Sequence, residues 1–425
     1  MAGEGKRLRL DIRARMAAVK PVSTRYVDVL DGIRALCVFG VAWFHIWQQS
    51  WLWPGIHTQQ LGTLVNLEPL VRAGYILVDT MLLISGFLLF LPYARHMTEG
   101  EPLPSARDFY VKRALRILPS YWLCLLIVLL GFALPRREFT DTADMLRDLL
   151  SHLSFTHVFW YETYIATHLN VVLWTLAIEV QFYLIFPLLA RLFVRRPLVT
   201  WGGMAAAGLA FRYLVVLAQP DTNMWVNQLP AFLDVYANGM LAALCYVHLA
   251  RALRADKWTR LLFTALALLA VVGLWQIIVR QAASNGYETI RINQARNRFW
   301  FSAFGCALIV CAANAGAGLR WLLSNRVMRV ASAVSFQYYM WHQFLAVQLK
   351  RWGFPPSVSP EPHIDGEMPW QWQYTLCAFL LPLVLSLVLT YCFEQPIARA
   401  GLRWWKARQQ RGRLPDGETQ TSASP

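Results

Sequence analysis

Charged residues are scarce in this chain, and acidic residues are scarcer than basic ones. Asp, Glu, Lys and Arg make up 15% of the 425 residues, whereas 56% are hydrophobic and 14% are aromatic. With a mean hydropathy of +0.36, the chain has too little polar surface for an ordinary soluble globule of this length. Most of it must therefore face lipid or other helices.

Several sequence signatures are also missing. The seven cysteines fall in apolar segments without a CxxC pair, and no histidine cluster has metal-ligand spacing. We therefore expect neither a disulfide framework nor a metal site. The net charge of +15 is spread over many short loops, and no RNP, zinc or helix-turn-helix motif accompanies it. This pattern disfavours nucleic-acid binding.

Long hydrophobic runs are what the chain has instead. Runs near twenty residues predict membrane-spanning helices. Ten such runs occur, at about 30–48, 73–92, 117–134, 173–193, 199–218, 231–248, 260–279, 299–315, 330–349 and 373–393. We predict an all-α, polytopic integral membrane protein with about ten transmembrane helices in one bundle.

Basic residues set the expected orientation. An even number of spans places both termini on one side, and the loops on that side are rich in Arg and Lys. By the positive-inside rule that side is cytoplasmic, in a cell membrane. Four of the five opposite loops are more mixed in charge, whereas the loop at 280–298 is basic and is the exception.

Three regions follow from this layout. Residues 1–27 are expected to form a cytoplasmic basic arm that can lie on anionic lipid. Residues 28–398 form the membrane domain, and residues 399–425 form a cytoplasmic tail that is first basic and then disordered. The segment at about 135–172 is rich in aromatic residues and histidine, which suggests a packed or half-inserted segment over the bundle.

The most informative motif is Asp31-Gly32-Ile33-Arg34 followed, in the same apolar run, by His45. Eleven residues of α-helix make about three full turns, so Arg34 and His45 project from one face about 16 Å apart along the axis. Ionisable groups inside a membrane are costly and tend to persist where they line a cavity or a path. This helix is therefore predicted to carry chemistry.

Depth along the predicted spans sorts the polar residues into two layers. Counting about 1.5 Å per residue places four of them in the outer half of the membrane: His45, Asp79, Glu179 and His342. Four others fall near the cytoplasmic ends of their spans: Arg34, Arg113, Arg116 and Glu394. A basic cytoplasmic layer below a carboxylate and histidine layer suits transfer from an anionic cytosolic donor to an outward-facing acceptor.

On these residues the chain resembles the acyltransferase-3 family of membrane O-acyltransferases. Leu30-Asp31-Gly32-Ile33-Arg34-Ala35 with His45 is similar to the family's Arg-x10-His signature. Similar blocks follow in the family's order: Val78-Asp79 with Ile84-Ser85-Gly86-Phe87-Leu88, Arg113 and Arg116 before Pro119 and Tyr121-Trp122, Trp174 to Glu179, Ser335 with Tyr338 and His342, and Tyr391 with Glu394 and Pro396. The resemblance covers about residues 28–398.

The resemblance implies transfer of an acyl group, most simply acetyl from acetyl-coenzyme A, to a hydroxyl of a carbohydrate or lipid-linked glycan. Arg34, Arg113 and Arg116 would then hold the donor phosphates. His45 would take the hydroxyl proton, with Asp79 or Glu179 orienting it and His342 nearby. No metal is implied. Some members carry an extracellular hydrolase-like domain after the last helix, whereas this chain continues for about 30 residues beyond its tenth predicted span. We therefore expect the membrane bundle to perform the whole transfer.

The sequence departs from the family pattern at position 180, and other roles for the candidate site residues remain open. Val180 stands where many members of the family have a second glutamate, so a paired-carboxylate mechanism is doubtful there. Arg34 could serve lipid phosphates, Asp79 could pair with a cation between helices, and Arg113 and Arg116 could serve topology alone. A covalent acyl-histidine is a further variant. A different class, a transporter or flippase with a proton relay, would show repeat symmetry, and the sequence shows none.

Overall fold

The computed structural model describes residues 26–411 except 59–61, 220 and 254–255. The predicted basic arm therefore lies outside the described residues, apart from Tyr26 and Val27, as does the tail beyond Arg411. The described chain is almost entirely helical, with one antiparallel hairpin of β1 (Gly55–Thr58) and β2 (Gly62–Asn66). The predicted all-α class is confirmed.

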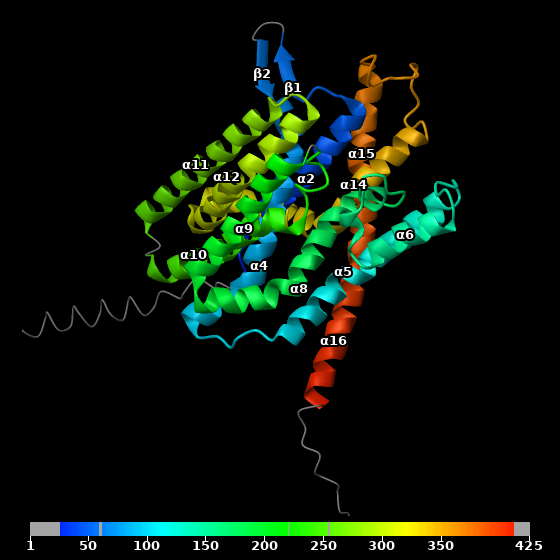
Figure 1. The fold of residues 1–425 in the computed structure, drawn as a ribbon. Helices are drawn as coiled ribbons and strands as arrows, with labels where there is room; N and C mark the ends of the chain where they lie inside the picture. The colour runs from blue at the N-terminus through cyan, green and yellow to red at the C-terminus, as the bar shows by residue number, and fades with distance from the viewer. Residues whose placement is uncertain (1–25, 59–61, 220, 254–255, 412–425) are drawn as a thin grey trace, which may run out of the picture.

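Each of the ten predicted spans coincides with a long helix (Figure 1). Eight segments of the described chain have the length and apolarity to cross a membrane. They are α2 (Val29–Ser50); α3, η1 and α4 (Glu68–Ala73, Gly74–Ile76, Leu77–Glu99); α5 with the π-helical turn η2 (Ala106–Val128, Leu129–Ala133); η4 and α8 (Val171–Leu173, Trp174–Arg195); α9 (Pro197–Ala218); η5 and α10 (Leu229–Phe232, Leu233–Ala252); α11 (Lys257–Ala282); and α15, η6 and α16 (Met368–Leu389, Thr390–Glu394, Gln395–Arg411).

Two predicted spans differ from these eight. Helix α12 (Tyr287–Asn314) passes the same test only together with α13 (Ala317–Ser324), to which it is bent by 112°. Helix α14 (Arg326–Arg351) is long enough but too polar. It buries Gln337, His342 and Gln348, and a helix that carries such groups must lie against other helices and not in lipid. The structure thus supports eight or nine spans by composition, against about ten predicted.

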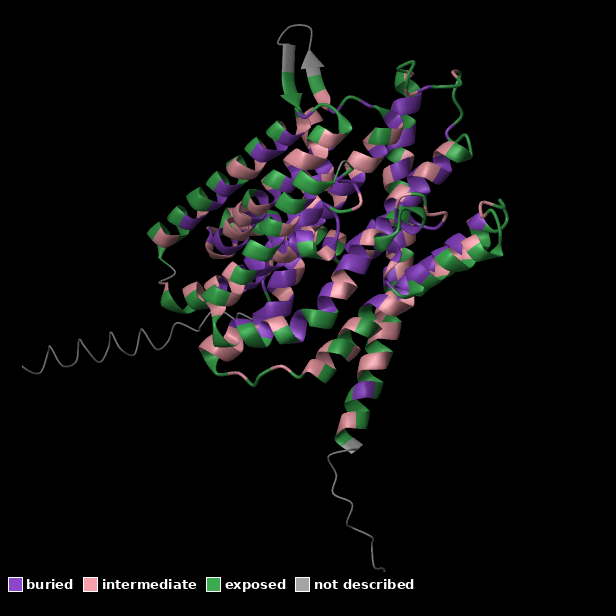
Figure 2. Cartoon of the chain, viewed as in Figure 1, coloured by how far each residue is buried: buried purple, intermediate pink, exposed green. Residues whose placement is uncertain are grey.

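Burial separates central helices from peripheral ones (Figure 2). In the apolar stretches of α4 and α10, 72% of the residues are buried, compared with 28% in α9 and α11. Glycine brings the two central helices together: a Cβ atom on Gly239 of α10 would lie 2.2 Å from the carbonyl oxygen of Leu83 on α4. Small residues at such crossings allow close backbone approach in membranes.

The peripheral helices leave large apolar side chains uncovered. Leu198 and Leu217 of α9 and Leu269 of α11 are all more than 60% exposed. Apolar surface of this extent is not stable against water, whereas it matches lipid chains. The protein is an integral membrane protein.

The segment between α5 and α8 packs over the bundle as the sequence suggests. It contains α6 (Thr142–Leu153), η3 (His157–Phe159) and α7 (Tyr161–Tyr164). Tyr121 of α5 donates a hydrogen bond to the carbonyl oxygen of His152 at 2.9 Å, and the His152 and His157 rings stack at 3.9 Å. Burial and the neighbouring His152 lower the pKa of His157 well below its usual value, so this ring is neutral.

The start of α2 and the end of α16 lie at one end of the bundle, and the β-hairpin lies at the other (Figure 1). We call these the α16 end and the hairpin end. The basic segment after residue 398, for which no helix was predicted, forms most of α16. It is held against α5, because the Trp405 indole N–H donates to Asp108 at 3.0 Å and Arg107 lies 4.9 Å over the same ring.

Candidate active site

Helix α2 supplies residues to two adjacent cavities. Its N-terminus is capped by the Asp28 side chain, which accepts from the Val29 backbone N–H, so the helix begins just before the Asp-Gly-Ile-Arg motif. Arg34 lines a cavity of about 330 Å³ nearer the α16 end. His45, three turns further along, lines a cavity of about 560 Å³ nearer the hairpin end. We call them the Arg34 cavity and the His45 cavity.

The Arg34 cavity gathers guanidinium groups from three helices. Arg34 of α2, Arg95 of α4, and Arg113 and Arg116 of α5 line it, and Glu179 is the carboxylate among its described lining residues. Arg95 is paired with Glu101 at 3.1 Å. Within the described chain, none of Arg34, Arg113 and Arg116 forms a salt bridge, and Arg113 Nε is buried without a hydrogen-bond partner.

This arrangement is suited to a polyanion. An Arg guanidinium presents donors in a fixed fork that matches phosphate oxygens, and a buried donor without a partner costs about 1–3 kcal/mol until something accepts from it. Arg34 is close enough to Arg116 for their charges to repel. The structure thus gathers in one cavity the three arginines that were expected to hold donor phosphates.

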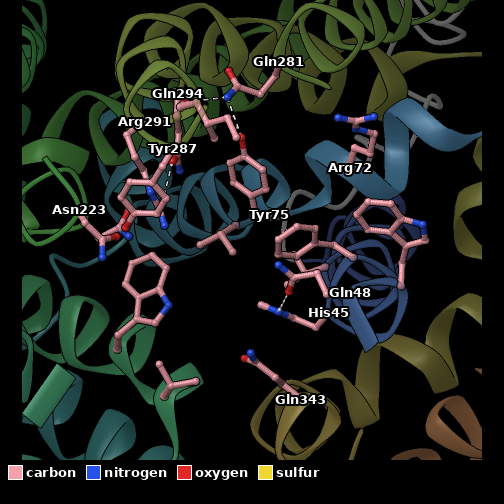
Figure 3. Close-up of a pocket in the computed structure, with 18 of the residues that line it drawn as sticks. His45, Gln48, Arg72, Tyr75, Asn223, Gln281, Tyr287, Arg291, Gln294 and Gln343 are labelled. Carbon is pink, nitrogen blue, oxygen red and sulfur yellow. Dashed lines mark hydrogen bonds between the residues drawn. The ribbon is translucent and has the colours of Figure 1, made fainter. Parts of the chain in front are cut away.

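The His45 cavity has a different chemistry (Figure 3). Its lining consists mainly of residues with side-chain amides or aromatic rings: Gln48, Asn223, Asn227, Gln281, Gln294, Gln343, Phe44, Trp47, Tyr75, Tyr164, Trp174, Tyr287 and Tyr339. Among the described lining residues there is no Asp or Glu. Amides donate and accept hydrogen bonds, and aromatic rings offer flat apolar faces. Such a lining fits a molecule that carries many hydroxyl groups.

A thin wall divides the two cavities. Val78 of α4 and Tyr339 of α14 line both of them, and Tyr339 is 4% exposed. A group that reaches this wall from the Arg34 cavity is separated from the His45 cavity by one layer of side chains. The wall is therefore where molecules held in the two cavities would come closest to each other.

The two predicted histidines meet close to that wall. The ring centroids of His45 and His342 are 5.3 Å apart. His342 Nδ1 lies 2.7 Å from the carbonyl oxygen of Tyr339, so Nδ1 carries the proton and donates it. His342 Nε2 is buried and has no hydrogen-bond partner within the described residues. Its lone pair remains available to a donor.

A glutamine, and not a carboxylate, orients His45. Its Nδ1 lies 3.1 Å from Oε1 of Gln48, one turn further along α2. With that oxygen as acceptor, Nδ1 carries the proton and Nε2 is left as a proton acceptor on a residue that lines the cavity. Gln48 was missed from the sequence, although its spacing of three residues from His45 on one helix face is a signal that could have identified it.

Glu179 and Asp79, expected beside His45, have other partners. Glu179 of α8 lies in the Arg34 cavity, where it accepts from Ser85 at 2.7 Å and from the hydroxyl of Tyr183. Asp79 is buried in an ion pair with Arg298 of α12 at 3.3 Å. The structure thus brings the His45 and His342 rings together, and within the described chain neither carboxylate forms a hydrogen bond or an ion pair with them.

Arg298 was not singled out as a site residue, although it belongs to the basic loop at 280–298. It is fully buried, donates to the carbonyl oxygen of Val226 at 2.6 Å and lies 3.9 Å over the Phe232 ring. Arg298 is one of the basic residues that make the loop at 280–298 an exception to the positive-inside pattern, and its pairing with Asp79 explains its presence there. Among the described residues, no group of three or more His, Cys, Asp and Glu side chains could hold a metal ion.

Comparison with known proteins gives a consistent result. A family model described as an acyltransferase domain matches residues 27–391. O-acetyltransferase OatA of Staphylococcus aureus is 28% identical over 186 residues, which are 42% of this chain and 27% of OatA. A putative O-acetyltransferase of the same species, SACOL0978, is 26% identical over 175 residues, 39% of this chain and 25% of that protein. The match thus spans about a quarter of the length of these relatives. No solved structure matches.

Proposed function

The chain belongs to the acyltransferase-3 family of membrane O-acyltransferases, and from that premise we propose that it moves an acetyl group from cytosolic acetyl-coenzyme A to a hydroxyl of a carbohydrate or lipid-linked glycan. The observation that supports this proposal most directly is the pair of cavities, which share a wall formed by Val78 and Tyr339. One cavity contains Arg34, Arg113 and Arg116, which form no salt bridge with any described residue, and the other is rich in amides and aromatic rings.

The donor would enter from the α16 end, which we assign to the cytoplasm. The sequence places most of the basic loops at that end, as the positive-inside rule requires of the cytoplasmic side of a cell membrane. Arg34, Arg113 and Arg116 would hold the phosphates of the donor. About 16 Å of helix separate Arg34 from His45, so an extended donor bound at the arginines would carry its thioester towards the wall.

The acceptor would occupy the His45 cavity. Its hydroxyl would donate to His45 Nε2, which takes the proton as the oxygen attacks the thioester carbonyl carbon. The C–S bond breaks as the C–O bond forms, and the proton passes from His45 to the departing thiolate. Gln48 would hold the ring in the required tautomer, and His342 Nε2 would accept a second hydrogen bond from the acceptor or from protonated His45.

Two groups expected to act on His45 receive other assignments in this proposal. Glu179, beside Arg34 and hydrogen-bonded to Ser85, would order the donor cavity. Asp79, paired with Arg298, would hold α4 against α12. A base acting without a carboxylate partner remains effective, because a neutral imidazole is itself a proton acceptor near neutral pH.

A direct test uses the purified protein in lipid nanodiscs with acetyl-coenzyme A labelled in the acetyl group. Release of free coenzyme A should require added envelope glycans, and the label should appear on them as an alkali-labile ester. A transporter or flippase with a proton relay would bind or move its cargo without cleaving the thioester. Absence of glycan-dependent thioester cleavage would favour that class.

A further inference from the structure

We propose that the acceptor is an anionic glycan and that Arg291 binds its carboxylate or phosphate group in the His45 cavity. This inference rests on the proposed function and adds the chemical class of the acceptor. Arg291 lies on α12 and lines the cavity, opposite His45 and Gln343 in the close-up view (Figure 3). It belongs to the one outer loop that departs from the positive-inside pattern.

The other arginines near this cavity are paired with carboxylates. Arg298 pairs with Asp79 at 3.3 Å, and Arg212 of α9 pairs with Asp234 of α10 at 2.7 Å. Arg72, at the same cavity, pairs with Glu68 at 3.2 Å. Arg291 differs from all three, since no Asp or Glu among the described residues lies within ion-pairing distance of it.

The guanidinium of Arg291 is held in place but not satisfied. It lies 5.3 Å over the Tyr287 ring and makes a long hydrogen bond of 3.4 Å from Nη1 to Gln294 Oε1. Its Nε is buried without a partner in the described chain. An arginine positioned by a ring and an amide, with donors to spare, is prepared to bind a planar carboxylate or a phosphate.

The charge of the whole cavity points to the same ligand. No carboxylate is among its described lining residues, and of its two arginines only Arg72 is paired, with Glu68. Arg291 therefore gives the cavity a positive potential, and a cleft lined by one sign of charge concentrates ligands of the opposite sign. A neutral sugar would use the amides and the rings and leave Arg291 without a counter-charge. An acidic sugar, or a sugar phosphate, would supply it.

The test uses envelope glycans of the source cell, separated by anion exchange into a neutral and an anionic pool. With labelled acetyl-coenzyme A and the protein in nanodiscs, the label should enter the anionic pool. Labelling of the neutral pool alone would overturn this inference while leaving O-acetyl transfer intact. Labelling of neither pool would contradict the proposed function and this inference with it.

Chemical treatment of the anionic pool separates the two sources of charge. Reduction of carboxyl groups to alcohols should abolish labelling if the anion is a carboxylate, and mild dephosphorylation should abolish it if the anion is a phosphate. Undiminished labelling after both treatments would overturn the inference.

Substitutions at position 291 test whether Arg291 itself binds the anionic group of the acceptor. Arg291→Gln should raise the KM for the anionic pool about 10- to 100-fold with little change in the KM for acetyl-coenzyme A, and Arg291→Lys should recover part of the loss. Arg296→Gln is the matched control, because Arg296 is exposed on the same helix outside the cavity lining. Thermal unfolding of each variant reports folding. An unchanged acceptor KM in a folded Arg291→Gln protein would refute the assignment.

Discussion

At the scale of single residues, the arginines of the Arg34 cavity should act on donor binding. Arg113 and Arg116 lie one turn apart on α5 and line that cavity without a salt bridge in the described structure. Arg116→Gln or Arg113→Gln should raise the KM for acetyl-coenzyme A about 10- to 100-fold, because a charge-assisted contact contributes about 1.5–3 kcal/mol and is made in the ground state too.

Steady-state donor titration in one detergent measures this effect. Lysine in place of Arg116 should restore the affinity only partly, since it keeps the charge but loses the planar fork. Lys112→Gln is the control, because Lys112 is exposed on the same helix and does not line the cavity. Unchanged donor KM in both glutamine variants would mean that the two arginines serve topology alone.

Gln48 should act through His45. If its Oε1 holds Nδ1–H of His45, Gln48→Ala should lower kcat about tenfold while the donor KM stays within about twofold, since the ring would lose its fixed tautomer. Gln48→Glu, which still accepts from Nδ1, should retain more activity than alanine. Equal rates for the alanine variant and the parent protein would show that the ring needs no orienting partner.

At the scale of helices, the Asp79–Arg298 pair joins α4 to α12. The two side chains are 2% and 0% exposed. Breaking a buried ion pair by removing one partner costs about 3–5 kcal/mol, whereas replacing both by apolar residues can be neutral. Asp79→Leu should therefore lower the unfolding temperature of the purified protein markedly, and Asp79→Leu with Arg298→Met should recover most of it.

Activity of the double variant separates the two roles of Asp79. A structural pair predicts that activity returns together with stability. A stable double variant without activity would instead assign Asp79 a part in the chemistry. Glu68→Leu serves as a control for stability alone, because its pair with Arg72 is exposed on both sides and contributes little.

The sequence predicted helices better than it predicted their partners. All ten apolar runs became helices because burial of apolar side chains and internal hydrogen bonding of the backbone favour helices in lipid. The pairing of Asp79 with Arg298, 219 residues apart, follows from how α4 and α12 pack, and no local periodicity encodes that. For the same reason, depth estimated along separate helices predicted that Glu179 lies beside His45, whereas the packing of the helices puts it beside Arg34.

Helix α14 and the segment after residue 398 show the same limit. Polar side chains in α14 lower its hydropathy, yet the helix is buried by its contacts with α2 and α15. The basic composition of α16 gave no sign of a helix, which forms against α5 through Trp405 and Asp108. Contacts between distant parts of the chain therefore determine the burial of α14 and the formation of α16.

At the scale of the whole molecule, the account requires the α16 end to face the cytoplasm. Reporter fusions after residues 102, 196, 255 and 325 should report the cytoplasm, and fusions after 60, 220, 285 and 360 should report the outside, because the helices alternate in direction between these points and the basic loops stay inside. An outside signal at any of the first four positions would overturn the orientation and the entry side of the donor.

The central claim is that His45 takes a proton from an acceptor hydroxyl at the wall between the two cavities. The decisive measurement compares acetyl transfer to glycan by the parent protein, His45→Ala and His248→Ala, with donor affinity determined for each. His248 is exposed on α10 and lines neither cavity. His45→Ala should lose about two to four decades of transfer rate with little change in donor affinity, while His248→Ala keeps its rate. A folded His45→Ala protein that retains more than about half of the parent rate would contradict the account.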